Sequence, residues 1–464
     1  MNDAAVGPDE IQCQVARSLD AIEADGREGI WIQRRSRADV LADAARVAWR
    51  VGEGERLPLA GRTVAVKGNV DVAGIRTTAG CPEFGEVAAR SAPAVAALEA
   101  AGAVVVGVTN LDQFATGLVG TRSPYGVCPN AWWPERISGG SSSGSATAVA
   151  AGLVDLGVGT DTAGSGRIPA AAHGIAGIKP TRGRLTTAGV VPACRSLDCL
   201  SVFAVDVELA DLAVRIAAGA RPESVDDDPW FRPGPNPLPA ALAGTVRIGV
   251  PKLTAEAFDG VAAGPDVFRA AVDELTVAVE GVPGRSVREV PVDIESFVAA
   301  GRLLYDGAFV AERYAAVGDF VAAGVGTFDP TVRSIIEASA DLPAWRYAED
   351  LGELRRLAAL TAPVWADIDV LVVPSAPRLP TVAEVVADPI GLNSMLGTYT
   401  NFVNLLDLAA VTVPVWAAAG VSGHDPVAEP PPSLTLVGPA WSDATLVSLA
   451  ARLPSGTPAT RRSS

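Results

Sequence analysis

The chain of 464 residues contains only two histidines, His173 and His424, and only three lysines, Lys67, Lys179 and Lys252. Two histidines are too few for a His-rich zinc site, and they disfavour mechanisms that use two imidazoles. The scarcity of lysine makes each one informative. A lysine in an apolar or Gly/Ser-rich setting has a lowered pKa and becomes a candidate base.

Several other features are missing from the sequence. Lys and Arg total 37 against 53 Asp and Glu, which gives a net charge of −16, and no run of basic residues occurs. Nucleic-acid binding is therefore not expected, because it depends on clustered cations. No clean apolar stretch of about 20 residues occurs, so we expect no membrane span. The first residues, MNDAAVGPDE, lack the basic and apolar regions of a secretory signal.

The cysteines indicate a reducing compartment. There are five of them, an odd number, and none forms a CxxC pair. Reduced, buried thiols in a cytoplasmic protein fit this pattern better than a disulfide framework. Hydrophobic residues make up 49% of the chain and charged residues 19%, which is enough apolar material for a large buried core.

The order of sequence patterns predicts an α/β protein. Residues 1–50 have helical periodicity, and beyond Pro58 short β-branched runs alternate with helical stretches. This alternation favours a large mixed central sheet covered by helices on both faces. A Pro/Asp-rich stretch at 221–239 predicts a long surface connection. The predicted strands are 63–66, 104–108, 153–158, 246–250, 370–373, 411–413 and 433–437, and the predicted helices include 93–101, 146–151, 265–279, 294–316 and 342–366.

Candidate chemistry is concentrated in two Gly/Ser-rich loops. ISGGSSSGS at 137–145 and GTDTAGSG at 159–166 each run into a predicted helix, and a predicted strand separates them. Their serines Ser141 and Ser165 can therefore lie at the same edge of a sheet. Lys67 follows the first predicted strand, where burial lowers the pKa of its amine and suits it to act as a base.

Three interpretations of these loops compete. A phosphate-binding P-loop requires GK[ST], which is absent. Gly140-x-Ser142-x-Gly144 matches the nucleophile elbow of α/β-hydrolases, with His424 downstream in the required order. The third interpretation is a relay in which Ser165 attacks, Ser141 passes the proton and neutral Lys67 accepts it. This relay needs no histidine.

The segments AVKGN, GGSSSGS and GTDTAGSGRIPA resemble the amidase signature family, and the resemblance extends over about residues 57–450. It implies a Ser–cisSer–Lys triad of Ser165 as nucleophile, Ser141 as bridging serine and Lys67 as base. It also implies an oxyanion hole formed by the loop residues before the nucleophile. These residues are Thr162, Ala163 and Gly164. Such N–H donors stabilise the charge that develops on the substrate oxygen.

Three further segments resemble the allophanate hydrolase branch of that family: NLDQFATGLVGTRSPY at 110–125, GVVPACRSLDC at 189–199 and TYTNFVNLLD at 398–407. The resemblance implies that Tyr305 and Arg313 bind the substrate carboxylate and that Gly117 is a further substrate-binding residue. On one helix, residues eight apart lie about 12 Å apart along the axis and about 80° apart around it, so Tyr305 and Arg313 could reach one small anion. A surface Arg313 paired with Glu312 or Asp306 is the structural alternative.

The sequence thus predicts a cytoplasmic amidohydrolase of one large domain. Its expected parts are a helical extension (1–50), a catalytic domain (51–452) and a disordered tail (453–464). The favoured substrate is allophanate, cleaved with release of ammonia and without a metal or cofactor. The amidase subunit of an amidotransferase, or hydrolysis of another small amide, is the alternative. The expected partners are the small amide and a second copy of the chain in a homodimer, with no nucleic acid and no membrane.

Overall fold

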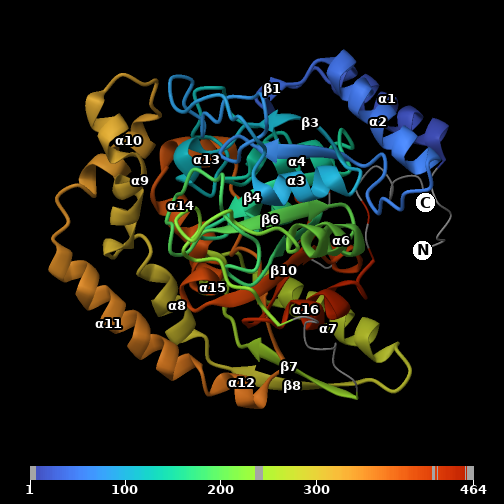
Figure 1. The fold of residues 1–464 in the computed structure, drawn as a ribbon. Coiled ribbons are helices and arrows are strands. Elements are labelled where there is room, and N and C mark those ends of the chain that lie inside the picture. Colours follow the sequence, from blue (N-terminus) through green and yellow to red (C-terminus); the bar gives the residue numbers. More distant parts are fainter. Residues whose placement is uncertain (1–6, 236–243, 421–423, 426, 455, 457–464) are drawn as a thin grey trace.

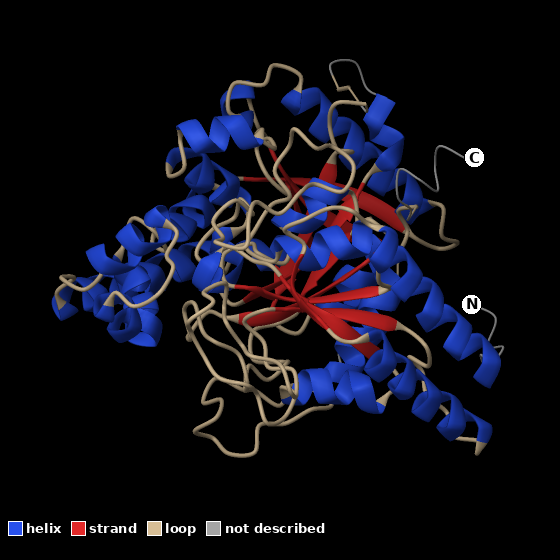
Figure 2. Ribbon diagram, turned by 90° about the horizontal axis from the view of Figure 1, so that it is seen from above, coloured by secondary structure: helices blue, strands red, loops and turns tan. Residues whose placement is uncertain are grey.

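The computed structural model describes residues 7–235, 244–420, 424–425, 427–454 and 456. One mixed sheet of 11 strands crosses the molecule in the order β1-β3-β2-β4-β6-β5-β10-β11-β9-β7-β8 (Figures 1 and 2). The strands are β1 Trp31–Arg34, β2 Thr63–Lys67, β3 Val104–Thr109, β4 Leu156–Asp161, β5 Ala176–Lys179, β6 Cys199–Ala204, β7 Thr245–Pro251, β8 Ser286–Val292, β9 Val370–Pro374, β10 Leu408–Pro414 and β11 Ser433–Pro439. The predicted fold class, a large mixed sheet with helices on both faces, is confirmed.

The α-helices cover both faces of this sheet (Figure 2). They are α1 Pro8–Ala24, α2 Arg37–Gly52, α3 Pro93–Ala100, α4 Ser143–Ala150, α5 Ile168–His173, α6 Val207–Ala217, α7 Gly264–Glu280, α8 Glu295–Arg302, α9 Ala311–Ala323, α10 Pro330–Ala338, α11 Ala344–Thr361, α12 Val364–Asp367, α13 Val382–Ala387, α14 Gly391–Leu396, α15 Asn401–Leu405 and α16 Asp443–Ala450. The helices α9, α10 and α11 form an arm on one side of the molecule, and α1 and α2 lie on another (Figure 1).

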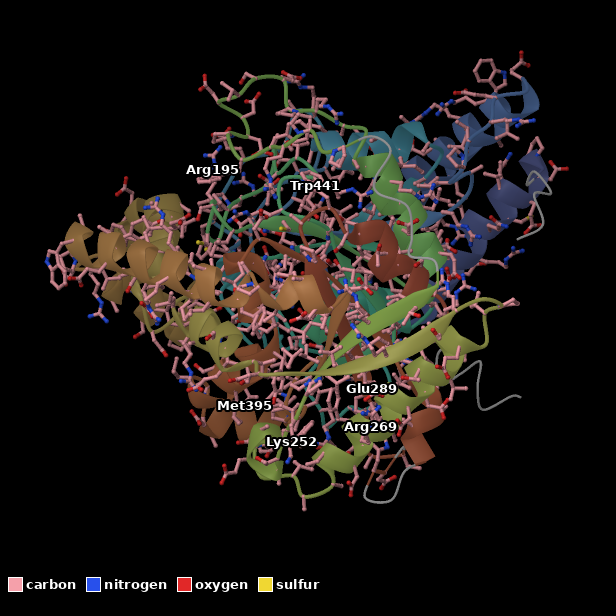
Figure 3. All side chains as sticks on the ribbon, turned by 90° about the horizontal axis from the view of Figure 1, so that it is seen from below. Arg195, Lys252, Arg269, Glu289, Met395 and Trp441 are labelled. Atoms are coloured by element: carbon pink, nitrogen blue, oxygen red, sulfur yellow. The ribbon has the colours of Figure 1, made fainter. Side chains whose placement is uncertain are left out.

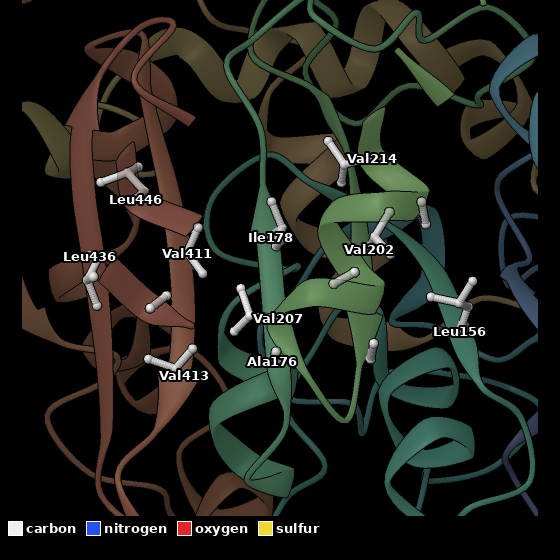
Figure 4. Packing of buried hydrophobic residues seen from close by; sticks show 14 of the residues in the cluster. Leu156, Ala176, Ile178, Val202, Val207, Val214, Val411, Val413, Leu436 and Leu446 are labelled. Atoms are coloured by element: carbon white, nitrogen blue, oxygen red, sulfur yellow. The ribbon is translucent and has the colours of Figure 1, made fainter. Parts of the chain in front are cut away.

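Side-chain alternation along the central strands divides the core into two layers. On β2, Val64 and Val66 pack with α3 and α6, whereas Ala65 packs with α1, α2 and α4 on the opposite face. This is the period of two expected for a strand that is buried on both faces. The first layer continues across β10 and β11, where Val411 and Leu436 meet Leu446 of α16 (Figure 4).

The register of the sheet brings the ends of two parallel strands together. β2 and β4 run parallel, with Val66 opposite Val158. The carboxyl ends of both strands therefore lie at the same edge, with Lys67 at the end of β2 and Asp161 at the end of β4. Ligand sites of α/β sheets form at such edges. The outermost strand on the side away from β1 is β8, and there Arg269 of α7 donates hydrogen bonds of 2.7 and 2.8 Å to Glu289 (Figure 3).

The prediction of one helix over 294–316 is wrong. Helix α8 ends at Arg302, a turn follows, and the chain becomes helical again from Ala308 as a short 3₁₀ turn before α9. Asp350 of α11 explains the break, because its carboxylate accepts a hydrogen bond from the backbone N–H of Ala308 at 2.6 Å. Gly307 also has no room for a side chain there, since a Cβ would lie 2.5 Å from the carbonyl oxygen of Leu303.

Other boundaries also differ from the prediction. The helix predicted over 342–366 is divided into α11 and α12 near Pro363, which has no N–H to continue the helix. The strand predicted at 153–158 begins three residues later, after Asp155, whose carboxylate accepts a hydrogen bond from the backbone N–H of Thr63 at 2.9 Å. β1, β5, β6 and β8 were not predicted.

The first 14 residues of the predicted surface connection, 221–234, contain no helix or strand. This stretch is anchored at Arg232, whose guanidinium donates two hydrogen bonds of 2.7 Å to Asp407. Residues 236–239 of the connection lie outside the described residues, as does most of the predicted tail at 453–464. Within the described part of the chain, no helix has the length and apolar character to cross a bilayer.

We predict that the layer around β11 dominates stability. Leu436→Ala should lower the free energy of unfolding by about 2–5 kcal/mol, because Leu436 is fully buried and its truncation leaves a cavity. Leu360→Ala is the control, since Leu360 is 52% exposed and should change stability by no more than about 0.5 kcal/mol. Denaturant titration of both variants checks this, and equal losses would contradict the assignment.

Candidate active site

Lys67 is fully buried at the end of β2. Its Nζ lies 2.8 Å from Oγ of Ser141 and 2.6 Å from Oγ1 of Thr160 on β4. Burial lowers the pKa of this amine to about 7. A substantial fraction of Lys67 is therefore neutral near neutral pH, with a lone pair available to accept a proton.

Charged neighbours act on the same amine in opposite directions. The carboxylates of Asp112, Asp198 and Asp161 raise the pKa of Lys67, and the guanidinium of Arg313 lowers it. The desolvation of the amine outweighs the three carboxylates, so the pKa remains well below that of an exposed lysine.

The two serines complete a hydrogen-bonded line with Lys67. Oγ of Ser141 lies 2.9 Å from Oγ of Ser165, and the Gly140–Ser141 peptide bond is cis. Gly140 cannot carry a side chain, because a Cβ would lie 1.9 Å from Oδ2 of Asp112. The structure thus brings together all three residues of the triad that the sequence resemblance implies.

The loop before Ser165 leaves backbone donors available. Among the described residues, the N–H groups of Ala163, Gly164 and Ser165 donate no hydrogen bond. Gly164 has φ +146°, and a Cβ there would lie 2.4 Å from Oγ1 of Thr400. Only glycine fits this conformation and this approach, so the course of the loop through Thr162, Ala163 and Gly164 depends on it.

A buried ion pair supports this loop from below. Arg167 donates hydrogen bonds of 2.9 and 2.8 Å to the carboxylate of Asp161, and the N–H of Gly166 donates another at 2.9 Å. Burial raises the pKa of Asp161, but Arg167 outweighs it and holds the pKa below its usual value. Arg167 also reaches the Thr400 carbonyl and the Asn404 amide oxygen, each at 2.9 Å. Both members of the pair therefore hold the nucleophile loop in position.

Asp198 joins the nucleophile loop to the segment 193–198. Its carboxylate accepts hydrogen bonds from the Thr162 hydroxyl and from the backbone N–H groups of Ala193 and Cys194. Burial raises the pKa of Asp198 to about 6. A surface cavity of about 440 Å³ reaches this residue and is also lined by Arg195, Asp226 and Asp227.

Arg313 and Tyr305 meet even though they do not share a helix. Tyr305 lies in the turn after α8 and Arg313 on α9, so the projection onto one helix was wrong. The chain folds back on itself, and Nη2 of Arg313 lies 3.3 Å from the Tyr305 hydroxyl. The guanidinium also lies over the Tyr305 ring, 5.5 Å from its centroid.

Arg313 is not the surface ion pair of the structural alternative. It is only 2% exposed, and among the described residues it has no carboxylate partner. Glu312 instead accepts hydrogen bonds from the Ser196 hydroxyl at 2.6 Å and the Tyr347 hydroxyl at 2.9 Å. An unpaired buried guanidinium is well suited to bind a carboxylate.

Gly117 lies between residues that contact this region. Thr116 accepts a hydrogen bond of 3.2 Å from Arg313, and the N–H of Leu118 donates one of 2.8 Å to Asn393. A Cβ on Gly117 would lie 2.6 Å from Oδ2 of Asp112, so the backbone must pass close to that carboxylate. Its N–H donates no hydrogen bond among the described residues.

Comparison with known proteins agrees with this geometry. The model of the family Amidase matches residues 18–447. The chain belongs to this amidase family. It is 43% identical over 429 residues to the urea amidolyase of Lachancea kluyveri, covering 91% of this chain but 22% of that protein. The chain therefore spans only about a fifth of the length of this relative.

Other amidase relatives carry different names. The chain is 36% identical to a glutamyl-tRNA(Gln) amidotransferase subunit of Thermus thermophilus, with 80% of each protein covered. Among solved structures, the allophanate hydrolase of Kluyveromyces lactis superposes with a TM-score of 0.85 at 39% identity, covering 96% of this chain and 70% of that one.

The chain departs from the usual amidase pattern at Gly68, where the resemblance leads us to expect Asp. A Cβ at this position would lie 2.6 Å from Cδ1 of Ile32 and 3.0 Å from the carbonyl oxygen of Thr109. Ile32 belongs to β1, so the edge strand occupies the space of the missing side chain. The next residue, Asn69, remains anchored by a hydrogen bond of 3.2 Å to the Val191 carbonyl.

The structure does not bring Ser142 and His424 together. The Ser142 hydroxyl lies 3.0 Å from the carbonyl oxygen of Thr160, and the His424 ring nitrogens lie 2.8 and 2.9 Å from backbone carbonyls of Pro430 and Ala419. His424 lines a separate, largely apolar cavity of about 180 Å³. The α/β-hydrolase interpretation therefore has no geometric support.

His173 is a packed residue of the core. It is buried on α5 and lies 2.9 Å from the Pro169 carbonyl and 3.2 Å from the Thr147 hydroxyl. Burial lowers the pKa of His173 to about 4. The ring is therefore neutral at physiological pH.

Sequence reasoning missed three residues of the site. Thr160 contacts Lys67, Thr116 contacts Arg313, and Asp112 packs against the loop of Ser141. Asp112 is fully buried and accepts hydrogen bonds from the backbone N–H groups of Val119 and Gly120. The available signals were a threonine inside the apolar strand β4 for Thr160, and an acidic residue three positions after the apolar strand β3 for Asp112.

We predict that the buried pair under the nucleophile loop is structurally indispensable. Arg167→Met should lower the free energy of unfolding by about 3–5 kcal/mol, because it leaves the Asp161 carboxylate buried without a counter-ion. Arg356→Met is a matched control, since Arg356 pairs with Glu353 in a largely exposed position and should lose no more than about 0.5 kcal/mol. Chemical denaturation of the two variants makes the comparison, and similar losses would refute the prediction.

Proposed function

We propose that the chain hydrolyses a small carboxylated amide, with allophanate as the favoured substrate and ammonia as the released product. The observation that carries this proposal is the hydrogen-bonded line of Lys67, Ser141 and Ser165 together with a buried Arg313 that has no carboxylate partner among the described residues. The names of the relatives, urea amidolyase and allophanate hydrolase, support the same substrate.

The proposed reaction begins at Ser165. Its Oγ attacks the carbonyl carbon of the amide and passes its proton to Oγ of Ser141, which passes its own proton to neutral Lys67. The free N–H groups of the preceding loop, from Ala163 to Ser165, stabilise the negative charge on the carbonyl oxygen. No histidine takes part, so the relay depends on the neutral form of Lys67.

The second half of the reaction reverses the proton transfer. The proton held by Lys67 returns through Ser141 to the leaving nitrogen, and the C–N bond breaks to release ammonia. Water then attacks the acyl group on Ser165, and the same relay accepts its proton. With allophanate the acid product is N-carboxycarbamate, and the regenerated Ser165 hydroxyl closes the cycle.

Arg313 supplies substrate recognition in this proposal. Its planar guanidinium can donate two parallel hydrogen bonds to a carboxylate, and the Tyr305 hydroxyl beside it can donate a third. The backbone N–H of Gly117 can donate a further hydrogen bond to the substrate. Because the guanidinium is buried, its attraction for a substrate anion is weakly screened by solvent.

The test is ammonia release from allophanate, malonamate, biuret and a simple acyl amide. Ser165→Ala should lose on the order of 10⁶-fold in kcat on every substrate. At a pH above the Lys67 limb, where the amine is neutral in both proteins, Arg313→Met should lose about 10- to 150-fold in kcat/KM on the two carboxylated substrates only, since a hydrogen bond to a charged group contributes about 1.5–3 kcal/mol. Equal losses on neutral amides would remove Arg313 from recognition, and full activity of Ser165→Ala would refute the relay.

The same assay separates the alternative function. The relationship to a glutamyl-tRNA(Gln) amidotransferase makes glutamine the informative added substrate. Preferential glutaminase activity would favour that function and contradict the allophanate proposal. Preference for allophanate over glutamine supports hydrolysis of a small carboxylated amide.

The pH dependence of the reaction reports on Lys67. Its pKa of about 7 lies below that of an ordinary lysine, so the amine is neutral above pH 7 and protonated below it. We expect kcat/KM for a neutral amide to rise with pH through about 7. Arg313→Met should move this limb to higher pH, because the Arg313 charge lowers the pKa of Lys67. A limb that is unchanged in this variant, or lies near pH 10, would contradict the assignment.

A further inference from the structure

The backbone beside Arg313 has an unusual conformation. Phe114 and Ala115 both have positive φ, at 51° and 54°, and both are buried. L-residues with a Cβ rarely adopt this left-handed region, and two in succession are rarer still. Such a conformation persists only where the surrounding structure enforces it, and it is frequent at ligand-binding sites.

The surroundings hold this turn from two sides. The Gln113 side chain donates hydrogen bonds to the carbonyls of Gly80 and Thr327, at 2.9 and 2.8 Å, and accepts one from the N–H of Asp329 at 3.0 Å. On the far side, the guanidinium of Arg122 donates a hydrogen bond of 3.0 Å to the Thr116 carbonyl. Thr116 is therefore held rigidly.

The turn directs uncharged oxygens at Arg313. Nη1 of Arg313 lies 3.2 Å from the Thr116 hydroxyl and 3.5 Å from the Ala115 carbonyl oxygen, and Nη2 faces the Tyr305 hydroxyl. These contacts orient the guanidinium without pairing it, among the described residues, with a carboxylate of the protein. Arg167, a fully buried arginine under the nucleophile loop, is instead paired with the Asp161 carboxylate.

The acidic residues near Arg313 are occupied elsewhere. Asp112 accepts hydrogen bonds from backbone N–H groups, Asp198 from the Thr162 hydroxyl, and Glu312 from Ser196 and Tyr347. We propose that Thr116 is a specificity-determining positioning residue, whose neutral hydroxyl holds Arg313 in place so that the guanidinium stays available to bind the carboxylate of the substrate. This inference rests on the proposed function, because it concerns how the same site selects anionic amides.

A matched pair of variants tests the role of Thr116. Thr116→Asn and Thr116→Asp have nearly equal size, and both keep an oxygen that can accept from Arg313. Only Thr116→Asp supplies a carboxylate that competes with the substrate for the guanidinium. The measured quantity is the selectivity, defined as kcat/KM for malonamate divided by kcat/KM for a neutral acyl amide of similar length.

We expect the selectivity of Thr116→Asp to be at least about tenfold below that of Thr116→Asn. The loss should appear as a higher KM for malonamate, because a fixed carboxylate next to the anion site repels and displaces the substrate anion. General damage to the fold lowers kcat/KM for both substrates alike, so it cancels in the selectivity. Addition of sodium malonate, a dianion without an amide, should inhibit the wild type and Thr116→Asn but inhibit Thr116→Asp much less.

Equal selectivity in the two variants, or equal inhibition by malonate, would overturn the inference. Failure of the proposed function is seen separately in the wild type, as a lack of preference for carboxylated amides. A wild type that prefers malonamate, combined with Thr116 variants of equal selectivity, would leave the proposed function intact and remove Thr116 from it.

Discussion

The site depends on the burial of one amine, that of Lys67. β2 is an interior strand that lies between β3 and β4, and Lys67 at its end is fully buried. No bulk water solvates the charge of the amine, so its pKa falls to about 7. The groups within hydrogen-bond distance of the amine are hydroxyl groups. Ser141 and Thr160 occupy those positions, and Ser165 follows at hydrogen-bond distance from Ser141. The surrounding loops are arranged to keep this line of atoms intact.

Two buried arginines show how pairing decides the role of a charge. Arg167 forms a bidentate ion pair with Asp161 and ties the nucleophile loop to α15 through Asn404. The charge of Arg167 is therefore balanced by a carboxylate of the protein itself. Arg313 contacts only neutral oxygens and the face of Tyr305 among the described residues, so the cost of burying its charge is offset only in part. A carboxylate that enters the site provides the missing compensation, and this difference underlies the proposed selectivity.

The amidase fold alone does not assign a substrate. Relatives named urea amidolyase and glutamyl-tRNA(Gln) amidotransferase share the family with this chain at 43% and 36% identity. Function must therefore be argued from the groups around the reacting atoms. The line from Lys67 to Ser165 accounts for amide chemistry in general. The region of Arg313, Tyr305 and Thr116 is where a choice between amides is made in our proposal.

The sequence by itself determined the class of fold and the three residues of the proton relay, but not Thr160, Thr116 and Asp112 around them. Short β-branched runs and Gly/Ser-rich loops are local signals, so they predicted seven of the strands and the meeting of Ser141 with Ser165. The break between α8 and α9, the left-handed turn at Phe114 and Ala115, and the neutral surroundings of Arg313 were decided only by the tertiary structure. Each depends on a contact with a distant residue, such as that of Asp350 with Ala308, and helical periodicity contains no information about such partners.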